Sequence, residues 1–236
     1  MRWFVDRCLP AAVLAMRAFP RVRGYGRTAA MINRRLLRLH ANPLVTTAMR
    51  QGHRLILDAR VPSQARAAFS GDYDNADVEI LCRLMEAGSA ALYVGANVGF
   101  YTVPLGCAAR AVGARVIAFE PLPANYRRLV QNVELNGLNG TVEPRMSGLS
   151  AAAGTAELTL REDFEEGGEV GNASLVIGDG LDAQFRRISV DLARLDDLWP
   201  KMGRARLAVV KIDIEGHEDE FLRGAAKHWS AAGLSC

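Results

Sequence analysis

Residues 90–99 read AALYVGANVG, a run of five mostly apolar residues followed by two glycines on either side of Asn97. A short apolar run that ends in glycine is typical of a buried parallel strand. Glycine also lets the backbone come close to a bound ligand where a side chain would collide. We therefore predict a strand at 90–94, a glycine-rich loop at 95–99, and then a helix with Pro104 in its first turn, where proline is tolerated.

Strand and helix patterns alternate along the rest of the chain. The expected strands are 115–119, about 141–146 and 207–214, and the expected helices start at Pro123 and Glu218. Between the last two strands, the stretches 155–160 and 188–192 alternate like an antiparallel pair, and the acidic, glycine-rich stretch 163–180 is expected to be a mobile loop. This order predicts an α/β fold, with a doubly wound parallel sheet and helices on both of its faces.

The beginning of the chain has a different composition. Residues 1–66 carry 13 arginines, no lysine and two aspartates, a net charge of +11, whereas the remainder carries −8. We predict two parts: a basic, mostly helical N-terminal arm, 1–66, and the α/β domain, 67–236. The helices of the arm are expected to be interrupted at Pro10, Pro20, Gly24 and Gly26.

The arginines of this arm allow two interpretations. Their stems can cover an apolar body, or their charges can attract phosphate or anionic lipid, so a weak contact with a membrane surface is one expectation. Nucleic-acid binding is not expected, because no recognition module or aromatic stacking platform accompanies the charge. No apolar run reaches the roughly 18 residues of a membrane-spanning helix, so no transmembrane segment is expected.

The cysteines indicate a reducing compartment. Cys8, Cys82, Cys107 and Cys236 are scattered, form no C-x-x-C pair and have no histidines at zinc-ligand spacing. We expect reduced thiols, no metal site and a cytoplasmic location.

Three of the expected strands end in glycine or polar residues. The three strand ends are Gly95-x-Asn97-x-Gly99, Glu120-Pro121 and Asp213-x-Glu215-Gly216. Ligands of doubly wound sheets bind outside the carboxyl ends of the strands, so these segments are expected to meet at one edge. A carboxylate at the position of Glu120 can accept two hydrogen bonds from a ribose diol, which predicts a nucleoside ligand.

The glycine loop helps to choose between nucleoside cofactors. A nicotinamide cofactor needs glycine at the first, third and sixth positions of its loop, where this chain has Gly95, Asn97 and Phe100. A phosphate-binding loop is absent from the sequence. The pattern therefore favours a nucleoside without a pyrophosphate, for which S-adenosylmethionine is the candidate.

Three segments then occur in a recognisable order. They are VGANVGFYT at 94–102, FEP at 119–121 with Asn125 after it, and KIDIEGHE at 211–218. Together they resemble the FkbM family of S-adenosylmethionine-dependent methyltransferases, over about residues 75–230. The resemblance implies a class I methyltransferase-like (Rossmann-like) fold and O-methylation of a hydroxyl on a small metabolite, sugar or glycan.

The resemblance also implies where the cofactor is held. The residues expected at its methionine end are Gly95, Asn97, Gly99 and Thr102. Glu120 is expected at the ribose, and the region of Ser147 at the adenine. The remaining members of the expected cofactor site are Tyr93, Pro121 and Asn125.

Methyl transfer to a hydroxyl also needs a base that accepts the proton. Asp213 is the first candidate, with Glu215 and His217 behind it. The alternative is that Glu215 stabilises the start of the helix and His217 is an ordinary surface residue.

Two departures from the family pattern keep a second function open. The family has aspartate where this chain has Tyr93, and a neutral phenol in place of that carboxylate is expected to weaken cofactor binding. The sequence given also stops after the helix that follows Asp213, without about three further strands. We then expect 207–214 to be an exposed apolar edge strand, which a partner chain or a rearranged N-terminal arm would cover, or which stays uncovered in a shortened gene product. The alternative function is a methyltransferase-fold remnant that acts as a binding or interaction protein.

Overall fold

The computed structural model describes residues 2–19, 24–39, 42–161, 185–203 and 205–227. The described chain forms two compact units, one of residues up to Asn75 and one that begins at Ala76. None of the described helices is long and apolar enough to cross a membrane.

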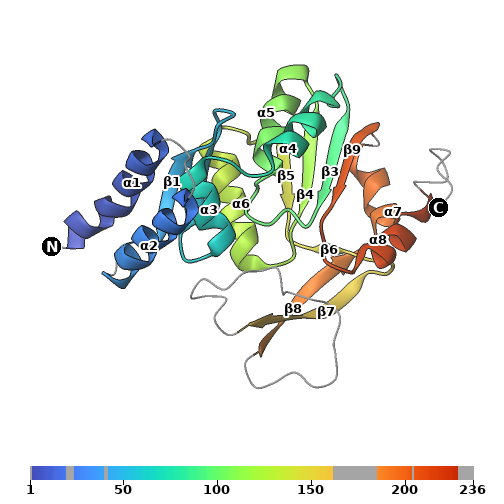
Figure 1. Ribbon diagram of the computed structural model, residues 1–236. Helices are drawn as coiled ribbons and strands as arrows, with labels where there is room; N and C mark the ends of the chain where they lie inside the picture. The colour runs from blue at the N-terminus through green and yellow to red at the C-terminus, as the bar shows by residue number, and fades with distance from the viewer. Residues whose placement is uncertain (1, 20–23, 40–41, 162–184, 204, 228–236) are drawn as a thin grey trace. The chain divides into compact units, whose positions relative to one another are not determined.

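The first unit packs three helices with a small antiparallel hairpin (Figure 1). Its elements are α1 (Arg2–Ala18), α2 (Tyr25–Arg38), β1 (Leu44–Ala48), β2 (Arg54–Asp58) and α3 (Pro62–Ser70). Tyr25 ties the helices together, because its hydroxyl lies 3.1 Å from the carbonyl oxygen of Met16 and 2.9 Å from that of Phe69. Asn33 of α2 donates a 2.7 Å hydrogen bond to the carbonyl oxygen of Ala59.

Two of the predicted helix breakers lie inside helices instead. Pro10 lies in the middle of α1, and Gly26 is the second residue of α2. An internal proline costs a helix about 3 kcal/mol, and burial of its neighbours Leu9 and Val13 at 0% and 2% exposure offsets that cost. Gly24 does precede α2 with a positive φ of 98°, whereas Pro20 lies outside the described residues.

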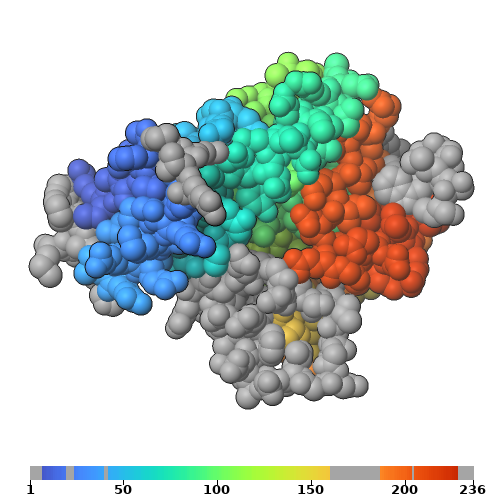
Figure 2. Space-filling view, in the orientation of Figure 1, coloured from blue at the N-terminus to red at the C-terminus, as the bar shows by residue number. Residues whose placement is uncertain are grey.

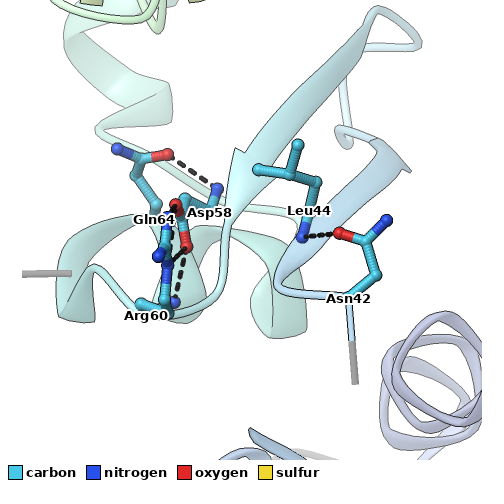
Figure 3. Close-up of polar contacts among 5 residues, drawn as sticks. All are labelled: Asn42, Leu44, Asp58, Arg60 and Gln64. Atoms are coloured by element: carbon cyan, nitrogen blue, oxygen red, sulfur yellow. Dashed lines mark hydrogen bonds and ion pairs between the residues drawn. The ribbon is translucent and has the colours of Figure 1, made fainter. Parts of the chain in front are cut away.

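Short polar contacts fix the start of β1 and the end of β2, which pair with one another at the open end of the hairpin (Figure 3). Asn42 Oδ1 accepts a 3.0 Å hydrogen bond from the N–H of Leu44, where β1 begins. After β2, Gln64 Oε1 accepts a 2.8 Å hydrogen bond from the N–H of Asp58, and the Asp58 carboxylate pairs with Arg60 at 2.6 Å. These contacts turn the chain from β2 into α3.

The second unit is built on a parallel sheet with the strand order β5-β4-β3-β9 (Figure 1). The strands are β3 (Ala90–Val94), β4 (Arg115–Phe119), β5 (Val142–Arg145) and β9 (Leu207–Ile212). The predicted parallel α/β sheet is confirmed. The last strand ends two residues earlier than predicted, because Glu215 and Gly216 take positive φ values of 42° and 90° and turn the chain away from the sheet.

Helices cover both faces of this sheet, as predicted. The helices of this part of the chain are α4 (Asn75–Arg83), α5 (Thr102–Val112), α6 (Pro123–Leu135), α7 (Leu195–Leu198), the 3₁₀ helix η3 (Trp199–Met202) and α8 (Glu218–Gly224). Helices α5 and α6 contact the strands of the sheet, and residues of α7, η3 and α8 share a buried cluster with β3 and β4. On one face, Val94 and Phe119 belong to the buried cluster that contains Phe221 of α8. Because side chains alternate along a strand, Tyr93 points to the other face, where its ring meets that of Tyr101 just before α5.

A second, three-stranded sheet of this unit has the order β6-β8-β7. Its strands are β6 (Gly148–Leu149), β7 (Gly154–Arg161) and β8 (Phe185–Ala193). The pairing of β7 with β8 is antiparallel, as predicted. The loop predicted at 163–180 lies outside the described residues.

Within the described residues, β9 pairs with β3 alone and so forms one edge of the parallel sheet. Only Val209 of its six residues is fully buried. Cys8, Cys82 and Cys107 are free thiols, as predicted, whereas Cys236 lies outside the described residues.

Candidate functional site

The three polar strand ends meet at the carboxyl edge of the parallel sheet. Val94 of β3 lies in register with Phe119 of β4 and with Ile212 of β9. The next residues of the three strands are Gly95, Glu120 and Asp213. The main-chain N–H of Gly95 donates a 2.9 Å hydrogen bond to the Phe119 carbonyl oxygen, and that of Asp213 donates one of 2.9 Å to the Val94 carbonyl oxygen. The predicted convergence of these segments is therefore present.

The loop after β3 depends on its glycines for internal reasons. Gly95 has a φ of 84°, and a Cβ atom there would overlap the carbonyl oxygen of Asp213. Gly99 has a φ of 101°, and a Cβ atom there would lie 3.0 Å from Leu129 Cδ1. The sequence interpretation attributed both glycines to a nearby cofactor. The structure adds that backbone conformation and packing already require glycine at both positions.

Asn97 shapes the middle of this loop. It has a φ of 50°, a conformation that asparagine tolerates better than most residues. Its Oδ1 accepts a 2.8 Å hydrogen bond from the N–H of Val98. Asn132 of α6, which is fully buried, donates a 2.8 Å hydrogen bond to the carbonyl oxygen of Val98. Sequence reasoning missed Asn132, although an asparagine directly before the apolar Val133 on a buried helix face was a usable signal.

Glu120 is buried against the same loop, with 5% of its surface exposed. Its carboxylate accepts hydrogen bonds from the N–H of Asn97 at 2.7 Å and from the N–H of Leu122 at 3.0 Å, with Asn125 Nδ2 at 3.5 Å. Burial raises the pKa of Glu120 to about 7, against the lowering effect of these hydrogen bonds. A carboxylate has about four lone-pair positions. If the Glu120 carboxylate accepts two hydrogen bonds from a ribose, as predicted, at least one of its three present hydrogen bonds must break.

The rings of Tyr93 and Tyr101 contact one another beside Lys211. Their rings are 5.7 Å apart at an interplanar angle of 70°, an edge-to-face contact. Lys211 Nζ lies 5.0 Å from the centre of the Tyr101 ring and 5.8 Å from that of Tyr93. The same ammonium group pairs with Asp213 Oδ2 at 3.0 Å. Tyr93 is thus a packed residue at 2% exposure, next to a cation.

The three candidate bases have different surroundings. The Asp213 side chain is 51% exposed and is held by Lys211. The pKa of Glu215 is raised by partial burial and by the nearby charges of Asp213 and Glu218. His217 Nε2 lies 3.0 Å from Ser150 Oγ, so this ring is in hydrogen-bond contact with the residue that follows β6. Of the three, Asp213 comes directly after a sheet strand.

The remaining predicted residues lie around the same loops. Thr102 is completely buried at the start of α5, and its hydroxyl oxygen has no hydrogen-bond partner among the described residues. Pro121 and Ser147 are half-buried. A Cβ atom on Gly148 would lie 3.8 Å from Pro121 Cβ, so the start of β6 passes beside Pro121. The buried hydroxyl of Thr102 is a polar atom that a bound ligand could satisfy.

Comparison with known proteins gives the family of this chain. Residues 94–232 match the model of the methyltransferase FkbM domain. Methyltransferase sdnD of Sordaria araneosa is 30% identical over 162 residues, which cover 57% of this chain and 60% of that protein. Hexuronic acid methyltransferase AglP of Haloferax volcanii is 32% identical over 131 residues, which cover 56% of this chain and 47% of that protein.

Among solved structures, methyltransferase FkbM from Methylobacillus flagellatus is 14% identical with a TM-score of 0.39, and the match covers 73% of this chain and 41% of that one. This chain thus spans 60% or less of the length of these three proteins. The α/β sheet with helices on both faces is the class I methyltransferase-like fold that the sequence predicted. Because the family model matches more than half of its residues, this chain belongs to the FkbM methyltransferase family.

Proposed function

We propose that this protein binds S-adenosylmethionine at the carboxyl edge of its parallel sheet and transfers the methyl group to a hydroxyl of a small metabolite or sugar. The observation that carries the proposal is the strand register, which brings Gly95, Glu120 and Asp213 to one edge. Membership of the FkbM family supports methyl transfer. The relative AglP is named a hexuronic acid methyltransferase, which supports a sugar-type acceptor.

The residues at this edge suit a cationic nucleoside. Glu120 supplies a carboxylate, and the buried Thr102 hydroxyl lacks a partner within the described chain. We assign the loop from Gly95 to Gly99 and the Thr102 hydroxyl to the methionine end of the cofactor. Glu120 is assigned to the ribose, and the segment around Ser147 to the adenine.

The chemistry that the bound cofactor supplies is a methyl group on a positively charged sulfur, which is a good leaving group. The protein then has to orient the acceptor and take up its proton while the new C–O bond forms and the C–S bond breaks. Lys211 holds Oδ2 of Asp213 at 3.0 Å, which leaves Oδ1 for the proton of the acceptor hydroxyl. His217 is the weaker candidate because its Nε2 already lies at hydrogen-bond distance from Ser150.

The experiment compares cofactor binding with methyl transfer. Binding is measured by titration calorimetry with S-adenosylmethionine. Transfer is measured with radiolabelled cofactor and a panel of sugars, hexuronic acids and hydroxylated metabolites. We expect Asp213→Asn to bind the cofactor like the wild type and to lose at least about a hundredfold in transfer rate. The matched control is Asp219→Asn, which removes an exposed carboxylate from the first turn of α8 and leaves both measurements unchanged.

The buried ring of Tyr93 favours a second candidate, a methyltransferase-fold protein that binds a partner without turnover. A phenol in place of the family's aspartate removes a negative charge from the neighbourhood of the cofactor. If neither the wild type nor Tyr93→Asp gives heat with S-adenosylmethionine, the enzyme proposal fails and this candidate is favoured.

A further inference from the structure

The outer face of α2 is lined by arginines. Arg27, Met31, Arg34 and Arg38 recur every three or four residues and therefore share one side of the helix. All four are exposed, as is Arg35 beside them. The opposite side holds the buried residues Ala29 and Asn33. We call Arg27, Arg34, Arg35 and Arg38 the α2 arginine stripe.

The α2 arginine stripe forms no ion pair within the described chain. Helix α2 contains no acidic residue, and none of the four guanidinium groups forms an ion pair with a described residue. Two other arginines of the same unit make polar contacts within it. Arg17 donates a 2.9 Å hydrogen bond to the Ala68 carbonyl oxygen, and Arg60 pairs with Asp58. Among the described residues, therefore, no carboxylate neutralises the charge of the stripe.

Large apolar side chains are exposed on the same pair of helices. Leu14 on α1 is 69% exposed, and Phe19, just after α1, is 68% exposed. Met31 in the middle of the stripe is 56% exposed, and Leu39, just after α2, is 63% exposed. Helices α1 and α2 contact one another, and Figure 2 shows their surfaces (blue) side by side. Cationic and apolar side chains are thus exposed together on one helix pair.

We propose that the α1–α2 pair docks on an anionic lipid bilayer. Guanidinium groups bind lipid phosphates in a bidentate manner, and leucine, phenylalanine and methionine side chains enter the boundary between headgroups and acyl chains. A nucleic acid offers phosphates as well, but it has no apolar phase in which Leu14, Phe19, Met31 and Leu39 would be buried. The exposed apolar residues therefore favour the lipid surface. This inference is independent of the methyl acceptor.

The test is co-sedimentation of the full chain with large vesicles. One set of vesicles is pure phosphatidylcholine, and the other contains phosphatidylglycerol as well. We expect binding to the anionic vesicles only, with an affinity that falls as the salt concentration rises. Each arginine near an anionic surface strengthens binding about fivefold, so Arg34→Gln/Arg38→Gln is expected to lower the partition coefficient roughly thirtyfold. Leu14→Gln/Met31→Gln is expected to weaken binding without a change in net charge.

The matched control is Arg127→Gln/Lys201→Gln, which removes two exposed cations from the second unit and changes the net charge equally. We expect it to bind vesicles like the wild type. Binding that is equal on both vesicle types, or that falls equally in the control, overturns the proposal. Binding of duplex RNA or DNA at equal phosphate concentration separates the two anions. If duplex RNA or DNA binds the protein but anionic vesicles do not sediment it, the surface binds nucleic acid and the lipid proposal is wrong.

Discussion

The main-chain N–H of Asn97 donates a 2.7 Å hydrogen bond to Oε2 of Glu120, and so joins the loop after β3 to the end of β4. The second oxygen of this carboxylate accepts from the N–H of Leu122, at the start of the turn into α6. One buried carboxylate thus organises two of the three strand ends of the candidate site. Its protonation state is consequently expected to affect the stability of the fold.

The stability of the protein is expected to depend on the titration of Glu120. Its pKa is raised by burial from 4.5 to about 7 in the folded protein. Between these values the folded state binds more protons than the unfolded state, so the free energy of unfolding falls as the pH rises. From about pH 5 to about pH 7 the loss amounts to about 2 kcal/mol. Glu120→Gln is expected to remove this part of the slope.

Urea unfolding at a series of pH values measures this effect. The control is Glu134→Gln, which removes an exposed carboxylate on α6 and should keep the slope of the wild type. A Glu120→Gln variant with an unchanged slope would show that the Glu120 carboxyl titrates normally.

Gly95 is expected to be the least replaceable glycine of the loop. An added Cβ would overlap the Asp213 carbonyl oxygen, which belongs to the backbone and cannot rotate away. Left-handed backbone strain and overpacking together predict that Gly95→Ala lowers the free energy of unfolding by about 3 kcal/mol. Gly140→Ala is the matched control, because Gly140 has a similar φ of 86° and nothing within 4 Å of its added Cβ.

Gly140→Ala should therefore show only the backbone contribution, about 1–2 kcal/mol. Equal losses in the two variants, measured by chemical unfolding, would mean that the contact between Gly95 and the end of β9 is unimportant.

The sequence was sufficient for the strands that carry the site. The strands 90–94 and 115–119 were predicted with the bounds that the structure has, because apolar runs between glycine and polar residues are strong signals. The parallel order then placed Glu120 and Asp213 at one edge. These features depend on local composition and on the general rules of α/β folds.

The sequence was insufficient for the features that depend on contacts between residues far apart in the chain. Pro10 remains inside α1 because neighbouring side chains are buried by other elements, which no local rule shows. The buried hydrogen bonds of Glu120 and the support of the loop by Asn132 join segments that are far apart in the chain. In the same way, the contact of His217 with Ser150 spans 67 positions and could not be inferred from the helix start alone.

Asn132 is expected to stabilise the candidate cofactor loop. Asn132→Ala leaves the buried Val98 carbonyl oxygen without its 2.8 Å hydrogen bond. An unsatisfied buried acceptor costs about 1–3 kcal/mol, so the free energy of unfolding should fall by that amount. Because the loop is then less well held, the affinity for S-adenosylmethionine should fall as well.

Chemical unfolding and titration calorimetry measure the two effects. Gln131→Ala, an exposed change at the neighbouring position of α6, is the control and should alter neither. If Asn132→Ala loses stability but keeps its cofactor affinity, the loop does not contribute to that site.

Tyr93→Asp tests the departure from the family pattern. The new carboxylate would lie beside Lys211 and near the proposed cofactor site, where the present phenol carries no charge. A charged hydrogen bond contributes about 1.5–3 kcal/mol, so we expect S-adenosylmethionine to bind at least about tenfold more tightly. The lost aromatic packing against Tyr101 should at the same time lower the free energy of unfolding by about 3 kcal/mol.

Tyr93→Asn separates charge from size, since it makes a similar cavity without a negative charge. We expect this variant to lose the same stability and to bind the cofactor no more tightly than the wild type. An equal gain in S-adenosylmethionine affinity in Tyr93→Asp and Tyr93→Asn would mean that the volume of Tyr93 hinders binding. If instead Asp weakens binding while Asn does not, the new carboxylate has drawn Lys211 away from Asp213, and the ion pair at 3.0 Å is then the feature on which the site depends.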